Sequence, residues 1–216
     1  DFIARQAMGR LAQPNEIAHA IEFLISDKNT YITGSGIDIN GGQFLSGWYK
    51  LYMKYIIGAY ASAPSLGNKD SEIESIFYDK LIQSIPEIRG LEIPFFGSEI
   101  HQLGTDFLLN IIKPDWDNVL TCIPGTMNFL AKMPEFGLAS DNHLGRTQAI
   151  AMHKRANYIL HKMNDLYGRK SIFIVQIHTA PSFPVKRVSS SIDSFLKSLD
   201  EILSWDWGNS KIVIEH

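Results

Sequence analysis

Residues 171–177 read SIFIVQI, a short apolar run that is rich in β-branched residues and ends at the polar His178. A run of this length and composition predicts a buried strand. It follows the segment 144–167, which we predict to be a long helix. A helix that leads directly into a buried strand is typical of an α/β fold with a parallel sheet.

The same alternation extends from residue 55 to residue 215. We predict strands and helices in turn at residues 55–60 (strand), 71–85 (helix), 90–94 (strand), 106–112 (helix), 118–123 (strand), 144–167 (helix), 171–177 (strand), 192–203 (helix) and 211–215 (strand). The inner face of the first helix is predicted to carry Ile73, Ile76, Phe77, Leu81 and Ile82. Repeated βα units imply a parallel sheet with right-handed crossovers. We expect about five units of a (β/α)8 TIM barrel.

Several of these strands end in polar residues, namely Glu92, Thr121, His178 and Glu215. In a (β/α)8 barrel the carboxyl ends of the strands surround the active site, so these side chains are expected to meet at one mouth. We therefore predict Glu92, His178 and Glu215 as catalytic residues. For Glu92 and His178, a buried salt-bridge or hydrogen-bonding role is the alternative.

Residues 53–216 resemble the N-terminal part of a bacterial family, domain of unknown function 4862, which is placed with the xylose-isomerase-like TIM barrels. The resemblance lies in Met53–Pro64, Gly90–Gly97, Leu120–Met127, Phe136–Ser140, His178–Pro181, Ile202–Trp207 and Val213–His216. It implies a sugar-type isomerase, epimerase or related carbohydrate enzyme with a small sugar-like substrate. In related enzymes a divalent metal is held by residues of the later strands and polarises a sugar oxygen.

The same resemblance, by strand count, implies that Glu215 is the first metal ligand of the intact parent protein. The other ligands are expected from strands beyond His216, and one carboxylate cannot hold a catalytic metal. We therefore expect no metal on this chain and no activity from it alone.

The first 48 residues resemble a different family. Pro14 suits the start of a helix, and short β segments are predicted at 31–33 and 37–39. Met8–Ala18, Phe23–Asp27, Tyr31–Gly34 and Asn40–Gly42 resemble the C-terminal tail of a short-chain dehydrogenase/reductase. This resemblance implies the last helix and strand of a Rossmann-type sheet, a helix-strand remnant that does not carry the chemistry.

The reductase machinery is not found in the sequence. A Gly-rich phosphate-binding turn is missing, so NAD(P) is expected only in the intact reductase parent. The family's catalytic Tyr and Lys stand four residues apart. Tyr158 and Lys162 have this spacing but lie in the other segment, where an exposed helix face explains them.

The two resemblances meet at residues 49–52, which resemble neither family. We therefore predict a reductase remnant at 1–48, a junction at 49–52 and a truncated barrel domain at 53–216. Our hypothesis is that two adjacent reading frames were joined. The alternatives are a fragment of an NAD(P)-dependent oxidoreductase, and a non-enzymatic misassembled fusion.

The composition sets outer limits. The chain has 216 residues, a formal charge of -3 and one cysteine, Cys122, which excludes an intrachain disulfide framework. Near-neutral charge without a basic cluster argues against nucleic acid. No apolar run approaches the roughly 20 residues of a membrane span. We expect a cytoplasmic protein with a buried Cys122, while its oligomeric state is left open.

The remaining polar candidates carry weaker predictions. His143, His153 and His161 are predicted to lie on a solvated helix face, and His101 lies in a loop near the predicted mouth. A turn at 124–126 is a candidate for presenting backbone amides to a phosphate or sugar oxygen. Trp205 and Trp207 are expected to pack between helix and sheet.

Overall fold

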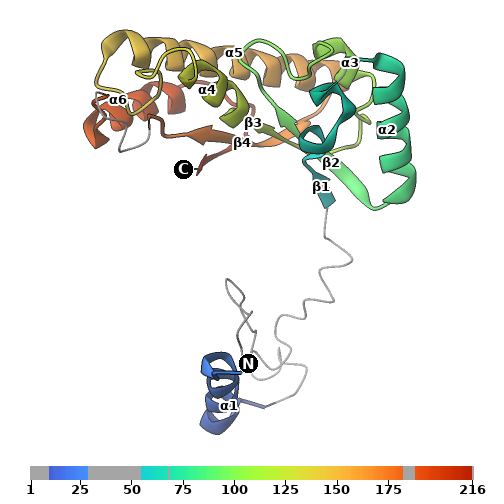
Figure 1. The fold of residues 1–216 in the computed structure, drawn as a ribbon, viewed down its shortest axis with the longest axis vertical. Coiled ribbons are helices and arrows are strands. Elements are labelled where there is room, and N and C mark those ends of the chain that lie inside the picture. The colour runs from blue at the N-terminus through green and yellow to red at the C-terminus, as the bar shows by residue number, and fades with distance from the viewer. Residues whose placement is uncertain (1–9, 29–54, 68, 182–187, 216) are drawn as a thin grey trace. The chain divides into compact units, whose positions relative to one another are not determined.

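The chain divides into two units, Asp1–Met53 and Lys54–His216, in the computed structural model (Figure 1). The structure describes residues 10–28, 55–67, 69–181 and 188–215. In the first unit it describes helix α1, Pro14–Ile25, whose start is stabilised by the side chain of Glu16 accepting from the Gln13 N–H at 2.7 Å. The β segments predicted at 31–33 and 37–39 lie outside the described residues.

The second unit is built on a parallel sheet. Its described strands are β1 (Tyr55–Ile57), β2 (Ile88–Pro94), β3 (Asn118–Thr121), β4 (Ile172–His178) and β5 (Lys211–Glu215). Their spatial order is β1-β2-β3-β4-β5, and every neighbouring pair is parallel. Because the spatial order follows the chain order, each strand is followed by a crossover to its next neighbour. The predicted α/β class and parallel sheet are confirmed.

Helices form the crossovers. They are α2 (Ser71–Ser84), α3 (Thr105–Leu109), α4 (Ile123–Leu130), α5 (His143–Tyr167) and α6 (Ile192–Leu203), with short 3-10 turns η3 (Ala59–Ser62) and η4 (Pro64–Leu66) after β1. Three of them begin at a side chain that accepts from the first turn: Asp70, Asn142 and Ser191. Figure 1 shows α4 and α5 lying along one face of the sheet.

The core lies between these helices and one face of the sheet. Leu91 and Ile93 of β2, Leu120 of β3, and Val175 and Ile177 of β4 belong to it. Successive residues of a strand point to opposite faces. The residues between these core positions, such as Glu92 and Gln176, therefore point to the other face of the sheet.

Two local predictions differ from the structure. The first strand ends at Ile57, and Tyr60 lies in the 3-10 turn that follows. Helix α4 occupies residues that we had assigned to the third strand and a long connection. It has only eight residues and begins almost directly after β3, with Pro124 in its first turn. Two turns are too short to show a helical period in the sequence.

The inner face of α2 is also different from the prediction. Ile73 and Ile76 are 45% and 46% exposed, whereas Glu74 and Tyr78 are buried. Phe77, Leu81 and Ile82 do pack against the core as predicted. Helix α2 presents Glu74 to the interior, where the carboxylate of Glu74 accepts hydrogen bonds from Ser65 of η4.

Candidate functional site

Strand register places the predicted site residues on one face of the sheet, toward the carboxyl ends of the strands. His178 and Glu215, the last residues of β4 and β5, are direct partners across the two strands. Thr121 of β3 is paired with Gln176, which lies two residues before His178 and so on the same face. On β2, Glu92 is the partner of Val119 and points to this face as well. We call this face, at the carboxyl end of the strands, the polar strand-end site.

Tyr60 joins this site, and sequence reasoning did not identify it. Its hydroxyl donates to Oε1 of Glu92 at 3.3 Å. Burial raises the pKa of Tyr60, and the carboxylates of Glu92 and Glu215 add to the increase. The negative charges of both predicted catalytic carboxylates therefore contribute to the raised pKa of this phenol. The only sequence signal was Gly58, which ends the strand and turns the chain.

Gly58 also makes room for Glu92. A Cβ atom at this position would lie 3.0 Å from Oε2 of Glu92 and 3.8 Å from the Tyr60 ring. Such a contact is tighter than ordinary van der Waals packing, so the missing side chain lets the carboxylate approach the end of β1.

His178 has a defined tautomer. Its Nδ1 accepts from the backbone N–H of Ala180 at 3.0 Å. A neutral imidazole that accepts at one nitrogen carries its proton on the other, here Nε2. The ring can therefore act as a hydrogen-bond donor through Nε2, and its orientation is held by the turn after β4.

Gln176 contributes a buried acceptor to the same face. Among the residues that the structure describes, its Oε1 is buried and has no hydrogen-bond partner. Its neighbour Thr121 uses Oγ1 to accept from the Ile123 N–H at 3.4 Å. An unpaired buried carbonyl is costly and is commonly explained by a bound water or ligand. The spacing of Gln176 from His178 was the sequence signal for this position.

No metal site is formed by the part of the chain described here. Within residues 10–28, 55–67, 69–181 and 188–215, no three His, Cys, Asp or Glu side chains are grouped so that they could hold an ion. The residues present around Glu215 thus do not fit a metal by themselves. The ligand role of Glu215 in the intact protein stays a prediction.

His101 serves a structural role instead of lining the mouth. Its Nε2 lies 3.0 Å from Oε1 of Glu74, and its Nδ1 accepts from the Leu103 N–H at 3.1 Å. The ring is buried, and this burial lowers its pKa. Its nitrogens are therefore used within the protein.

The helix histidines divide between the surface and the core. His143 is exposed, as predicted. The prediction for His153 was wrong, because this ring is buried, its Nδ1 lies 2.8 Å from the Ala149 carbonyl oxygen, and burial lowers its pKa to about 4. The spaced pair Tyr158 and Lys162 lies on an outer face of α5, where Tyr158 is 69% exposed.

The turn predicted at 124–126 is the first turn of α4. A Cβ atom on Gly125 would lie 2.6 Å from the Phe95 carbonyl oxygen, so the helix packs directly on the chain that leaves β2. Thr126 is buried and donates to the Cys122 carbonyl at 3.0 Å. The turn is therefore part of the packed interior. Cys122 is itself buried, as predicted, and burial raises the pKa of its thiol to about 12.

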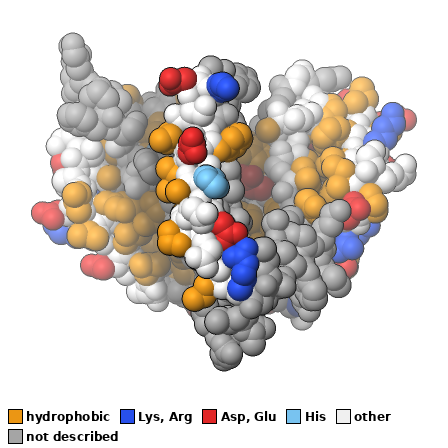
Figure 2. Space-filling view, turned by 90° about the horizontal axis from the view of Figure 1, so that it is seen from below, with side chains coloured by type: hydrophobic (Ala, Val, Ile, Leu, Met, Phe, Trp, Pro, Cys, Tyr) orange, Lys and Arg blue, Asp and Glu red, His pale blue; other side chains and the backbone are white. Residues whose placement is uncertain are grey.

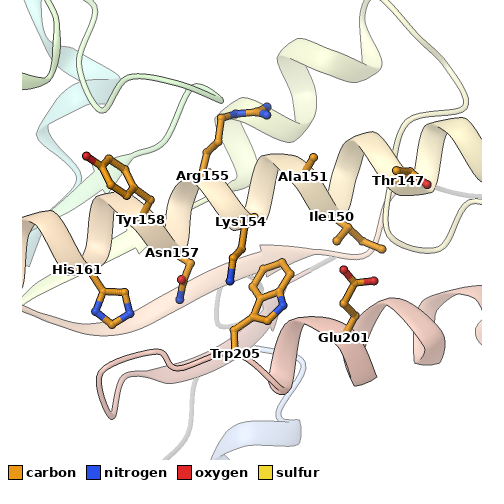
Figure 3. A pocket seen from close by; sticks show the side chains of 10 residues that line it. All are labelled: Thr147, Ile150, Ala151, Lys154, Arg155, Asn157, Tyr158, His161, Glu201 and Trp205. Carbon is orange, nitrogen blue, oxygen red and sulfur yellow. The ribbon is translucent and has the colours of Figure 1, made fainter.

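An open groove of about 740 Å³ lies on the helix side of the molecule, between α5 and the end of α6 (Figure 3). Figure 3 shows Lys154 pointing toward Trp205, and its Nζ is 4.4 Å from the ring centroid. Trp205 thus borders the surface, while Trp207 is buried in the core as predicted. None of the strand-end residues lines this groove.

No helix in the described ranges combines the length and apolar character that crossing a membrane would require.

The groups that the polar strand-end site offers for chemistry are two carboxylates, a phenol, a neutral imidazole and an amide oxygen, all at the carboxyl end of a parallel sheet. Carboxylates and imidazoles are general acids and bases, and the other groups position polar substrates.

Comparison with known proteins divides the chain in two. Residues 56–216 match the family described as "Domain of unknown function (DUF4862)", and residues 1–43 match the family described as "Enoyl-(Acyl carrier protein) reductase". No solved structure matches the chain. Both resemblances inferred from the sequence are therefore confirmed.

Individual relatives show the same division. "Uncharacterized protein STM3670" of Salmonella typhimurium is 35% identical over 164 residues, which are 75% of this chain and 51% of that protein. "Acetoacetyl-CoA reductase" of Shinella zoogloeoides is 57% identical over 43 residues, or 20% of this chain and 18% of that protein. "Dehydrogenase/reductase SDR family member 6" of Danio rerio is 48% identical over 42 residues, or 19% and 17%. The chain spans about half the length of the first relative and under a fifth of these reductases.

Proposed function

This chain belongs to the DUF4862 family, and we propose that intact members of the family isomerise or epimerise a small sugar-type substrate. The proposed site is the polar strand-end site, within a (β/α)8 barrel of which this chain supplies about five units. The observation that carries the proposal is that Tyr60 donates to the carboxylate of Glu92, on the sheet face where His178 and Glu215 end two neighbouring strands as direct partners. Parallel strands in chain order support the barrel.

Sugar isomerisation moves a proton between neighbouring carbons while the substrate oxygens are held by hydrogen bonds. A carboxylate can take the proton from carbon and return it, which is the role we assign to Glu92. The Nε2–H of His178 would donate to a substrate oxygen, and Oε1 of Gln176 would accept from a substrate hydroxyl. Tyr60 would hold Glu92 in position through its hydroxyl group.

Glu215 completes the proposed site. Glu215 is the direct strand partner of His178. It would therefore lie next to the substrate oxygen to which we propose that His178 donates. Its role as a metal ligand needs further ligands from the rest of the intact protein. No step assigned to the other residues depends on a metal.

The experiment uses the full-length Salmonella relative, incubated with a panel of aldoses and ketoses in D2O with and without added Mg2+ or Mn2+. Isomerases that exchange the transferred proton introduce deuterium at carbon, which proton NMR detects. We expect exchange with at least one sugar, and a loss of about a hundredfold or more when the counterpart of Glu92 is changed to Gln. The control changes the counterpart of Lys154 in the groove to Ala. The proposal fails if no sugar in the panel is converted under any condition.

A second candidate is a nicotinamide-dependent oxidoreductase, and the match of residues 1–43 favours it. That match covers under a fifth of the reductases it resembles. Titration of this chain with NADH and NADPH, followed by fluorescence, separates the two candidates. We expect no binding, and saturable micromolar binding would favour the oxidoreductase.

We also propose that residues 49–52 join parts of two proteins. Support comes from the two family matches, which end at residue 43 and begin at residue 56 and so leave the junction between them. Resequencing the locus tests the idea. A stop codon between the codons for Trp48 and Met53 is expected, and a continuous frame that yields one stable polypeptide would contradict it.

A further inference from the structure

Residues 136–141, between α4 and α5, are anchored in the interior of the molecule. Hydrophobic side chains reach the surface on the face shown in Figure 2, whereas Phe136 and Leu138 are both 0% exposed. The backbone carbonyl of Leu138 accepts from the hydroxyl of Ser198 in α6 at 2.7 Å. This stretch is therefore held both by the core and by a helix, and we call it the 136–141 segment.

The 136–141 segment packs on the chain that leaves β4. The N–H of Ala139 donates to the carbonyl oxygens of Thr179 at 3.0 Å and of Ala180 at 2.8 Å. A Cβ atom on Gly137 would lie 2.0 Å from the Ala180 carbonyl oxygen, and the φ of Gly137 is +149°. Glycine alone combines this backbone conformation with so close an approach. The Ala180 carbonyl therefore lies directly against the backbone of Gly137.

These contacts fix the direction of the Ala180 N–H. This N–H shares a planar peptide unit with the carbonyl of Thr179, so the hydrogen bond from Ala139 to that carbonyl orients the whole unit. The N–H end of the same unit donates to Nδ1 of His178 at 3.0 Å. The imidazole of His178 is therefore linked to the 136–141 segment through a single peptide unit.

We propose that Gly137 and Ala139 are positioning residues of the polar strand-end site. They hold the backbone of Ala180, which in turn fixes the tautomer and the orientation of the His178 imidazole. The use of this orientation to bind a substrate oxygen rests on the proposed function. The link from Gly137 to His178 is a property of the fold and can be measured without a substrate.

The test uses the full chain labelled with nitrogen-15 and measures, by NMR, the scalar coupling between the amide nitrogen of Ala180 and Nδ1 of His178. Such a coupling is transmitted only across an N–H···N hydrogen bond. At alkaline pH the wild-type chain should show the coupling, with His178 as the Nε2–H tautomer. Gly137→Ala should abolish the coupling and raise the share of the Nδ1–H tautomer, because the added methyl group must displace the Ala180 carbonyl.

Gly104→Ala is the matched control for backbone strain. Gly104 also has a positive φ, +96°, but no atom lies within 4 Å of an added Cβ. The control therefore shares the unfavourable conformation of the new alanine without the crowding. Circular dichroism confirms that each variant is folded.

Asp141→Asn is a second control, at the end of the same segment. The carboxylate of Asp141 accepts from the hydroxyls of Ser189, Ser191 and Ser194, which lie at the start of α6. This change should therefore leave the hydrogen bond between Ala180 and His178 in place.

Ser198→Ala keeps the test decisive if Gly137→Ala does not fold. It removes the donor to the Leu138 carbonyl without adding an atom. Exchange of the Ala180 amide with D2O should become about threefold faster or more, because the segment that holds it is loosened. Ser75→Ala, whose hydroxyl donates to a carbonyl of its own helix, should not change this rate.

The proposal is supported if the coupling is present in wild type and in both controls but lost in folded Gly137→Ala, or if Ser198→Ala alone accelerates exchange at Ala180. It is overturned if wild type lacks the coupling, or if folded Gly137→Ala keeps it or the controls lose it as well. If Gly137→Ala does not fold, unchanged exchange in Ser198→Ala overturns it. None of these results depends on activity, so they are distinguishable from a failure of the proposed function in the sugar panel.

Discussion

The Nε2 atom of His101 lies 3.0 Å from Oε1 of Glu74, and both side chains are at most 2% exposed. Because Nδ1 of His101 accepts from Leu103, the ring donates from Nε2 to the carboxylate. Glu74 also accepts from the backbone N–H of Ser65 at 2.8 Å and from its hydroxyl at 3.0 Å. One buried carboxylate therefore connects η4, α2 and the loop after β2.

We expect Glu74→Ala to destabilise the protein strongly. It leaves the donors of His101 and Ser65 buried without an acceptor, which costs roughly 3 kcal/mol of unfolding free energy. Urea denaturation followed by circular dichroism measures the loss. Glu72→Ala, an exposed position on the same helix, is the control. Equal midpoints for the two variants would rule out this role for Glu74.

Stability should fall in mild acid because of His153. Its pKa is lowered from 6.5 to about 4 in the folded state, so between these values the unfolded chain binds a proton that the folded chain does not. Stability is therefore lost as the pH falls through this window, by roughly 3 kcal/mol from this residue. His101 acts in the same direction.

The variant His153→Leu tests this prediction by denaturation at pH 4 to 8. It should flatten the dependence of stability on pH, whereas His143→Leu, at an exposed position, should not. An unchanged slope in His153→Leu would show that other groups are responsible.

The titration of Tyr60 tests the polar strand-end site without an activity assay. Burial and the nearby carboxylates raise its pKa, so Glu92→Gln should lower the pKa while leaving it above the ordinary value. NMR of ring-labelled tyrosine resolves this residue from the other seven, since the chain has 8 tyrosines. Glu87→Gln, an exposed change before β2, serves as the comparison. If Glu92→Gln leaves the pKa of Tyr60 unchanged, the carboxylate of Glu92 does not act on this phenol and the prediction is wrong.

Packing beneath α4 should not tolerate a methyl group. Gly125→Ala places a Cβ atom 2.6 Å from the Phe95 carbonyl oxygen and 3.1 Å from Sδ of Met152, so the backbone must move. We expect a loss of about 1–3 kcal/mol in unfolding free energy. Gly67→Ala, where the nearest atom is 3.9 Å away, should have little effect in the same denaturation experiment.

The sequence allowed the long and regular parts of this fold to be predicted. Helix α6 and strand β5 have the predicted bounds, because each has a clear period and polar residues at its ends. Helix α4 could not be recognised in this way, since two turns carry little periodic signal. The exposure of Ile73 was mispredicted because the buried position was taken by Glu74, whose partners come from other elements.

The candidate site was predictable only in part. Glu92, His178 and Glu215 were predictable as polar residues at the ends of predicted strands, but Tyr60 follows β1 in a turn whose direction depends on packing. His153 shows that a pattern can also be overlooked. Together with the buried residues Ala149, Ala156 and Leu160, it forms the spacing i, i+4, i+7 and i+11 that is typical of a core-facing helix stripe. The prediction of an exposed His153 was wrong because it relied on the polarity of histidine and not on this spacing.

The buried thiol of Cys122 is a natural probe of local opening in this protein. It is the single cysteine of the chain, it stands between β3 and α4, and its thiol is closed off from solvent. A thiol reagent can label it only in molecules that have opened at this junction. The rate of labelling therefore reports how often α4 separates from the sheet, without any engineered probe.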